Sequence, residues 1–254
     1  MPQELLKDRV AIVTGGGQGL GRGIALALAT QGAMVALMGR TQAALDDAHA
    51  EIESRGGRAI TVQGDVRKAA DIERCVAGTV EQFGGLDILV NNAQTYRHAL
   101  LLDATDDDME STWSSGPLAT FRFMRAAYPH LRERRGVIVN LGSGTQLMHD
   151  GAFYGVYVAA KNAISALSRT AAVEWGKDGI RVLVVMPAAE TDGVKAFRAR
   201  DPERYADMVS RVPLGRFGDS EHDVGRTIAW MVSDEASYMT GCTIMLDGGQ
   251  MLLR

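Results

Sequence analysis

The stretch Thr14-Gly15-Gly16-Gly17-Gln18-Gly19-Leu20-Gly21 indicates how this chain is expected to fold. An apolar run over residues 10–13 precedes it, and a segment rich in alanine and leucine over residues 22–30 follows it. This order predicts a strand, a glycine turn and the start of a helix. Such a turn presents backbone N–H groups and the positive end of a helix dipole to a phosphate. We expect a dinucleotide phosphate here, although a glycine turn without a ligand has the same pattern.

Composition sets limits on what the chain does. Its 254 residues suit one domain over residues 1–254, and no linker or low-complexity stretch divides them. The formal charge of −4 argues against nucleic acid or an anionic membrane as the main partner. The polar first residues lack the apolar core of a signal peptide, and no apolar run approaches the ~20 residues that span a bilayer. We expect a cytoplasmic protein with Cys75 and Cys242 as reduced thiols and with no metal site.

Seven apolar runs predict strands, and amphipathic patterns between them predict helices. The strands are expected at residues 10–13, 34–38, 59–63, 88–90, 137–141, 182–185 and 244–246. The helices are expected at residues 23–30, 42–55, 68–83, 106–131, 154–175 and 220–232, with caps at Thr105 and Ser220. Alternating strands and helices predict an α/β fold, a doubly wound parallel sheet with helices on both faces.

Residues 188–217 interrupt this alternation. The segment contains Pro202, Pro213 and several arginines, and its composition is compatible with short helices. Insertions after the carboxyl end of a strand commonly cover the ligand crevice of such sheets. We therefore interpret residues 188–217 as a substrate lid, and a purely structural excursion is the alternative.

The second chemical signal is Tyr157-Val158-Ala159-Ala160-Lys161. Residues four apart share a helix face, so Lys161 is expected one turn from Tyr157. A free tyrosine titrates near ~10, and a nearby ammonium stabilises its anion and lowers that pKa. The pair is therefore suited to proton transfer, although an exposed aromatic–cation pair shares this spacing.

Together, the T-G-x-x-x-G-x-G turn and the Y-x-x-x-K pair resemble the short-chain dehydrogenase/reductase family, over residues 7–249. The resemblance implies a Rossmann-type domain and a catalytic set of Ser143, Tyr157 and Lys161. In that set Tyr157 exchanges the proton, Ser143 bonds the substrate oxygen, and Lys161 lowers the pKa of the tyrosine and binds the nicotinamide ribose. Tyr157 and Lys161 are also expected to contact the cofactor. The remaining cofactor contacts that the resemblance implies or that the turn predicts are Gly15, Gln18, Gly19, Leu20, Gly21, Arg40, Thr41, Asp65, Val66, Asn91, Ala93, Pro187 and Thr191. A homotetramer is also implied, with Asp247-Gly248-Gly249 near subunit contacts.

The chain departs from the family pattern near the catalytic set. Gly116 stands where the family has an asparagine that anchors a proton-relay water, and Pro117 follows it. Proline has no N–H, so the carbonyl of Trp113 loses its helical donor. Either the relay is impaired or the backbone at this kink replaces the asparagine. Gln94 also replaces the glycine of N-N-A-G, and Ala188 replaces the glycine of P-G.

The end of the second strand bears on the choice between NAD and NADP. Gly39 occupies the position of the acidic residue that bonds the ribose of NAD, and Arg40 follows it. A guanidinium suits a 2′-phosphate. We therefore expect NADP(H) to be preferred, with NAD(H) possible, because Gln18 is neutral where many NADP-dependent relatives are basic. Arg40 has two alternative roles, stacking on adenine or simple solvation.

The sequence thus predicts an NADP(H)-dependent ketoreductase or alcohol dehydrogenase that acts on a small-molecule carbonyl or secondary alcohol. A non-catalytic dinucleotide-binding regulator is the main alternative, and a lyase or dehalogenase that has lost the cofactor is a third. The substrate itself cannot be read from the sequence. Candidate pocket residues are Tyr96, His98, Gln146, His149 and Phe153.

Overall fold

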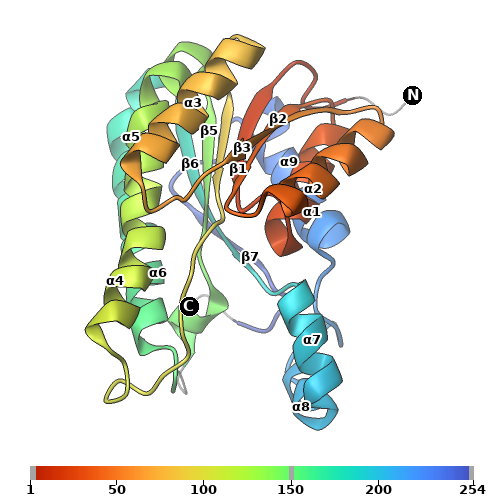
Figure 1. Cartoon of the computed structure of the whole chain (residues 1–254), viewed down its shortest axis with the longest axis vertical. Helices are drawn as coiled ribbons and strands as arrows, with labels where there is room; N and C mark the ends of the chain where they lie inside the picture. Colours follow the sequence, from red (N-terminus) through yellow and green to blue (C-terminus); the bar gives the residue numbers. More distant parts are fainter. Residues whose placement is uncertain (1–3, 149–151, 252–254) are drawn as a thin grey trace.

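A single parallel sheet forms the centre of this computed structural model, which describes residues 4–148 and 152–251 (Figure 1). In those residues the sheet has seven strands in the order β3-β2-β1-β4-β5-β6-β7. Their bounds are β1 Val10–Thr14, β2 Met34–Gly39, β3 Arg58–Gln63, β4 Ile88–Asn91, β5 Val137–Leu141, β6 Arg181–Pro187 and β7 Thr243–Leu246. The predicted doubly wound parallel sheet is confirmed, and every predicted strand is present.

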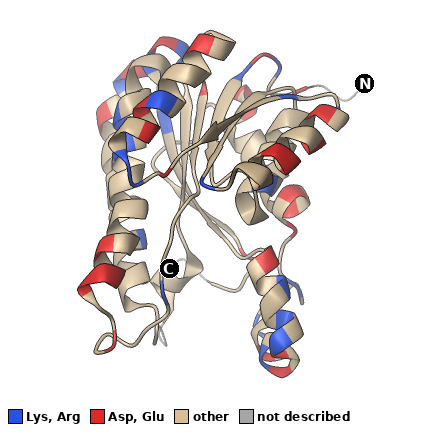
Figure 2. Ribbon diagram, in the orientation of Figure 1, with Lys and Arg blue, Asp and Glu red and all other residues tan. Residues whose placement is uncertain are grey.

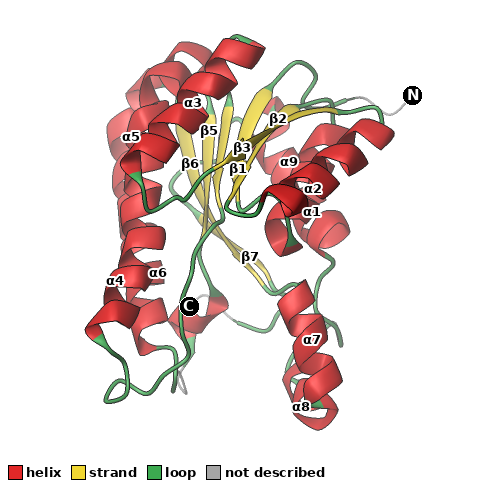
Figure 3. Cartoon of the chain, in the orientation of Figure 1, coloured by secondary structure: helices red, strands yellow, loops and turns green. Residues whose placement is uncertain are grey.

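Helices cover both faces of the sheet (Figure 3). The helices of the two layers are α1 Gly19–Thr30, α2 Gln42–Ser54, α3 Ala69–Phe83, α5 Pro117–Arg134, α6 Gly155–Trp175 and α9 Arg226–Val232. Along β1, Ala11 and Val13 pack into one core with α1, α2 and α9, whereas Val10 and Ile12 pack into the other with α3, α5 and α6. Alternate side chains of a strand point to opposite faces, so this continuous apolar run contributes to both cores.

The predicted helix over residues 106–131 is wrong as a single element. The structure has α4 Asp106–Ser115 and then α5, with Gly116 between them at φ −98° and ψ −98°. Pro117 is the first residue of α5, a position where its missing N–H costs nothing. The predicted cap at Thr105 is confirmed, because its side chain accepts a hydrogen bond from the backbone N–H of Asp108.

Residues 188–217 extend beyond the carboxyl ends of the strands, where α7 Asp192–Arg200 and α8 Pro202–Ser210 form a projecting arm (Figure 1). Basic and acidic residues are interspersed on this arm and on the outer helices, while the strands are mostly uncharged (Figure 2). The remaining short helices are η1 Gly144–Leu147, η2 Gly176–Asp178, η3 Ser220–Gly225 and η4 Asp234–Ala236.

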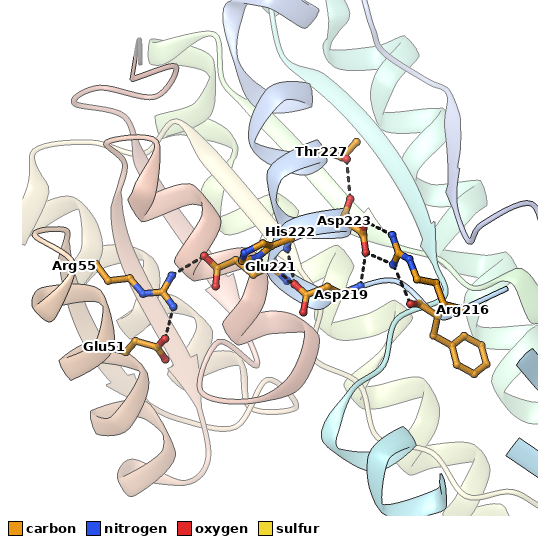
Figure 4. A network of polar contacts seen from close by, with 9 residues as sticks. Glu51, Arg55, Arg216, Asp219, Glu221, His222, Asp223 and Thr227 are labelled. Atoms are coloured by element: carbon orange, nitrogen blue, oxygen red, sulfur yellow. Dashed lines mark hydrogen bonds and ion pairs between the residues drawn. The ribbon is translucent and has the colours of Figure 1, made fainter. Parts of the chain in front are cut away.

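A polar network fixes the chain where it returns from the arm to the sheet (Figure 4). Arg216 binds the carboxylate of Asp223 through both terminal nitrogens, at 2.5 and 3.0 Å. Arg55, just after α2, binds Glu221 at 2.6 Å. The expected cap at Ser220 is wrong, because Asp219 accepts the N–H groups of residues 221 and 222 and η3 is a π-helical turn.

No helix within residues 4–148 or 152–251 combines the length and the apolar character needed to cross a membrane.

Candidate active site

A cavity of about 540 Å³ opens beyond the carboxyl ends of β1, β2 and β4. This is the crevice where doubly wound sheets bind ligands. Most predicted cofactor residues line it. The described lining consists of Gly15, Gly17, Gln18, Gly19, Leu20, Gly21, Gly39, Arg40, Thr41, Ala44, Leu45, Gly64, Asp65, Val66, Asn92, Ala93, Gln94, Thr95, Tyr96, Ser115, Thr191, Asp192 and Gly193.

The glycine turn has no space for side chains on its inner side. A Cβ atom on Gly21 would lie 2.2 Å from the carbonyl oxygen of Gly15, and one on Gly15 would lie 2.8 Å from Asn92 Nδ2. Gly19 opens toward the cavity with φ +52°, and Thr191 is its nearest neighbour, 3.8 Å from a Cβ placed there. Because α1 starts at Gly19, its free N–H groups face this opening. The turn therefore fits a phosphate group of a dinucleotide.

Asn92 and Thr14 hold the turn against the end of β4. Asn92 Nδ2 donates to the carbonyl oxygen of Thr14 at 2.8 Å. The hydroxyl of Thr14 accepts the N–H groups of Asn92 and Ala93 at 2.9 and 3.0 Å. Sequence reasoning gave no role to Asn92, although its neighbour in the N-N-A motif was selected. The side chain of that neighbour, Asn91, instead lies in the core and donates to Asn140 at 2.8 Å.

Arg40, Thr41, Asp65 and Val66 lie at the far end of the cavity, after β2 and β3. The carboxylate of Asp65 is bound by the guanidinium of Arg67 at 2.5 Å. This hydrogen bond lowers the pKa of Asp65 below its usual value despite partial burial, and the backbone N–H of Arg67 and the positive charges of Arg67 and Arg40 lower it further. Arg67 was not predicted. Its role follows from an Asx-type turn, in which Asp65 also accepts the N–H of Arg67 at 3.0 Å.

Ser143 and Tyr157 meet at the other end of the site. Ser143 follows β5 and caps η1, where its N–H donates to Gln146 Oε1 at 2.9 Å. Its hydroxyl is 2.8 Å from the hydroxyl of Thr145. Ser143 is also close enough to Tyr157 to act on it, because it lowers the pKa of the tyrosine. The structure therefore places these two predicted catalytic residues beside each other.

Lys161 lies one turn further along α6, with its ammonium nitrogen 5.5 Å from the centre of the Tyr157 ring. It is buried and donates to the carbonyl oxygen of Leu141 at 2.6 Å. Burial lowers the pKa of Lys161 to about 7. Burial also raises the pKa of Tyr157, with a further increase from Tyr96, and the bond to Ser143 opposes this only in part. Lys161 is not among the groups that shift the pKa of Tyr157 in this arrangement, so its lowering of that pKa stays a prediction.

Aromatic side chains cover Tyr157. The ring of Tyr96 stacks on it, with centroids 4.1 Å apart and planes 26° apart. The ring of His98 packs edge-on against the rings of Tyr96 and Tyr154, with centroid distances of 4.9 and 4.8 Å. Of these four aromatic residues, only Tyr96 lines the cavity. Tyr96 therefore links the cavity wall to the ring of Tyr157.

The other predicted contacts are dispersed. Thr191 lines the cavity and caps α7 through the N–H of Val194. Pro187 ends β6 and is not among the described lining residues. Phe153 is exposed at φ +71°, and His149 lies outside the described residues.

Among the residues that the structure describes, no group of three or more His, Cys, Asp or Glu side chains is arranged to hold a metal ion. Cys75 and Cys242 are free, and burial raises the pKa of Cys75 to about 12.

Known proteins share this fold and this sequence pattern. Residues 15–251 match the family described as Enoyl-(Acyl carrier protein) reductase. The 12alpha-hydroxysteroid dehydrogenase of a Clostridium species is 40% identical, covering 96% of this chain and 97% of that protein. A 3-oxoacyl-[acyl-carrier-protein] reductase of Staphylococcus epidermidis is 33% identical, and the match covers 95% of this chain and 98% of that protein. A short chain dehydrogenase from Burkholderia cenocepacia, solved in complex with NADP, has a TM-score of 0.89 and 34% identity, covering 96% and 98%.

The chain belongs to the short-chain dehydrogenase/reductase family. It is an oxidoreductase that transfers a hydride between a nicotinamide cofactor and a hydroxyl or carbonyl group of a small molecule.

Proposed function

We propose that the protein is an NADP(H)-dependent ketoreductase or secondary-alcohol dehydrogenase in which Ser143, Tyr157 and Lys161 act on the substrate oxygen. The observation that carries this proposal is the position of Tyr157 beside Ser143, with the buried Lys161 one helical turn away and 5.5 Å from the centre of the tyrosine ring. Non-catalytic binding of a dinucleotide would not require this arrangement.

In the reducing direction, Tyr157 donates its proton to the carbonyl oxygen as negative charge develops there. Its raised pKa keeps the phenol protonated near neutral pH, which is the form required of a donor. Ser143 donates a hydrogen bond to the same oxygen and stabilises the charge. Lys161 then returns a proton to the tyrosine, and its pKa of about 7 suits exchange near neutrality. When bound, the nicotinamide supplies the hydride.

The preference for NADP(H) rests on Arg40. This exposed residue lines the cavity directly after β2 and follows Gly39, which occupies the position of the acid in an NAD enzyme. In the part of the chain that the structure describes, no carboxylate is paired with its guanidinium. A 2′-phosphate would therefore find a positive charge at this edge, while the carboxylate of Asp65 is already bound to Arg67.

We further propose that residues 188–217 act as the substrate lid, because the arm formed by α7 and α8 begins at Thr191 on the cavity wall. The bulky cyclic alcohol named for the Clostridium relative suggests that ring-bearing substrates should be tested. A homotetramer and a cytoplasmic location stay predictions. Exposed Met109, Trp113 and Phe121 on α4 and α5 are candidates for a subunit contact.

The test is steady-state oxidation of NADPH and NADH with aliphatic, cyclic and steroid-like ketones, and the reverse reaction with the matching alcohols. We expect turnover with NADPH and at least one ketone. The regulator alternative predicts tight NADPH binding, measured by fluorescence, without turnover of any member of the panel. Turnover that prefers NADH would overturn the assignment of cofactor but not that of the reaction.

A further inference from the structure

Two departures from the family pattern meet in space. Gln94 lies in the loop after β4, and Gly116 lies at the break between α4 and α5. A Cβ atom on Gly116 would lie 2.5 Å from Gln94 Nε2 and 2.9 Å from Gln94 Cδ. The amide of Gln94 thus fills the space that a side chain at position 116 would enter. A glycine and an amide side chain have exchanged places relative to the family pattern.

The Gln94 amide has no hydrogen-bond partner in the described part of the protein. Both Nε2 and Oε1 are fully buried and unpaired. Burying an amide without hydrogen bonds is unfavourable, and native proteins generally satisfy such groups with protein atoms or with a bound water. This amide therefore marks a position that a small polar molecule completes.

A backbone acceptor lies next to the amide. The carbonyl oxygen of Thr112 is 2.9 Å from the same Cβ position on Gly116. It accepts the N–H of Gly116 at 3.0 Å, and its second lone pair can accept another hydrogen bond. A buried water requires two to four polar partners. The donor and the acceptor of the Gln94 amide, together with this carbonyl, supply that number.

The same loop reaches the catalytic tyrosine. The N–H of Thr95 donates to Ser115 Oγ at 3.0 Å, which fixes the loop to the end of α4. The next residue, Tyr96, stacks on Tyr157. The cavity is lined by Gln94, Tyr96 and Ser115. The unpaired amide of Gln94 and the ring of Tyr96, which stacks on Tyr157, therefore lie on the same wall of the cavity. Lys161 is buried, so its proton needs a carrier to reach solvent.

We propose that Gln94 is a positioning residue whose amide holds a water at the α4–α5 break, and that this water passes protons between solvent and Lys161. During reduction the water gives Lys161 the proton that replaces the one passed on through Tyr157 to the substrate oxygen, and solvent restores the proton of the water. Gln94 thus supplies from the loop the amide that the helix lacks at Gly116. This inference rests on the proposed function.

The main test is Gln94→Met, which keeps the length of the side chain and removes only its polar atoms. We expect kcat to fall about five- to fiftyfold, the effect of losing one hydrogen bond in a proton path. The solvent deuterium isotope effect on kcat should increase, because proton return becomes slower. The melting temperature should stay close to that of the wild type, because methionine fills the same buried space as glutamine. Gln42→Met is the matched control, since the Gln42 amide is paired with Asp46 and Thr61 outside the catalytic end.

The second test moves the amide to the helix. Gly116→Asn alone places its side chain against Gln94 and should lower the melting temperature. Gln94→Gly alone should lose activity as Gln94→Met does. The exchange Gln94→Gly/Gly116→Asn should recover most of the lost kcat and restore the isotope effect. A structural role for Gln94 would instead lower kcat and melting temperature together, without recovery in the exchange.

The outcomes separate this inference from the proposed function. If the wild type turns over a ketone and Gln94→Met keeps wild-type kcat and isotope effect, the inference is overturned and the proposed function stands. If the wild type turns over nothing while NADPH binds, the proposed function fails and the water relay fails with it. The melting temperatures of the cofactor-free variants still report whether the residues at 94 and 116 compete for one space.

Discussion

The two ends of the site are built in different ways. At the phosphate end, the backbone forms the cavity wall, and hydrogen bonds of Thr14 and Asn92 within the protein hold the turn in place. At the catalytic end, side chains form the site. There Lys161 is buried, the amide of Gln94 is unpaired, and Tyr96 covers Tyr157. The phosphate end is preorganised for binding, whereas the catalytic end needs a ligand, a water or a movement of Tyr96 to become complete.

This comparison predicts that binding and chemistry can be lost separately, and the largest effect is expected from Tyr157→Phe. Removing the proton donor should lower kcat by ~10²–10⁴-fold, the usual contribution of general acid catalysis. The Kd for NADPH should change little, because the phosphate end is intact. Tyr154→Phe is the matched control, since Tyr154 also lies beside Tyr157 but has Val158, not a lysine, four residues on. Wild-type kcat in Tyr157→Phe would exclude this tyrosine as the donor.

The converse variant is Gly21→Ala, which should weaken the binding of NADPH more than it lowers kcat. Its Cβ would lie 2.2 Å from the carbonyl oxygen of Gly15, so the backbone of the turn must shift. Overpacking of this kind costs roughly 1–3 kcal/mol, and we expect the Kd for NADPH to rise about 10- to 100-fold. Gly78→Ala is the control, because a Cβ there meets nothing within 4 Å. An unchanged Kd in Gly21→Ala would show that the turn does not bind the phosphates.

The phosphate end could be predicted from the sequence more fully than the catalytic end. The strands, the glycine turn and the helix after it follow from local patterns, and all three are present. The contact of Gln94 with Gly116 and the stacking of Tyr96 on Tyr157 join residues distant in sequence, and no local pattern encodes them. The N-N-A motif identified a segment that reaches the cavity, but it could not show that the strand register with β5 turns the Asn91 side chain toward Asn140.

Arg40→Ala is expected to have a smaller and more selective effect at the phosphate end. A charge-assisted hydrogen bond contributes about 1.5–3 kcal/mol, so the Kd for NADPH should rise roughly tenfold or more. The Kd for NADH, which has no 2′-phosphate, should change much less. Both constants can be measured by titration of cofactor fluorescence. Equal losses for the two cofactors would mean that Arg40 stacks on adenine, and no loss for either would mean that it is only solvated.

The smallest effect concerns the pH dependence of stability at the catalytic end. Lys161 has a pKa of about 7 in the folded protein and 10.5 as its ordinary value. Between these values the unfolded chain binds more protons than the folded chain. The free energy of unfolding should therefore rise with pH in this window and level off below pH 7, where Lys161 is protonated in both states.

Lys161→Met removes this group and should flatten that dependence. The difference in unfolding free energy between the wild type and Lys161→Met, both cofactor-free, should increase by on the order of 1 kcal/mol per pH unit from pH 7 to 9. Urea denaturation at several pH values measures it, and subtracting the variant cancels titrations such as that of Cys75. A difference that does not vary with pH would mean that Lys161 keeps its charge throughout. The lysine would then be able to lower the pKa of Tyr157 before any cofactor binds, and the catalytic end would be as preorganised as the phosphate end.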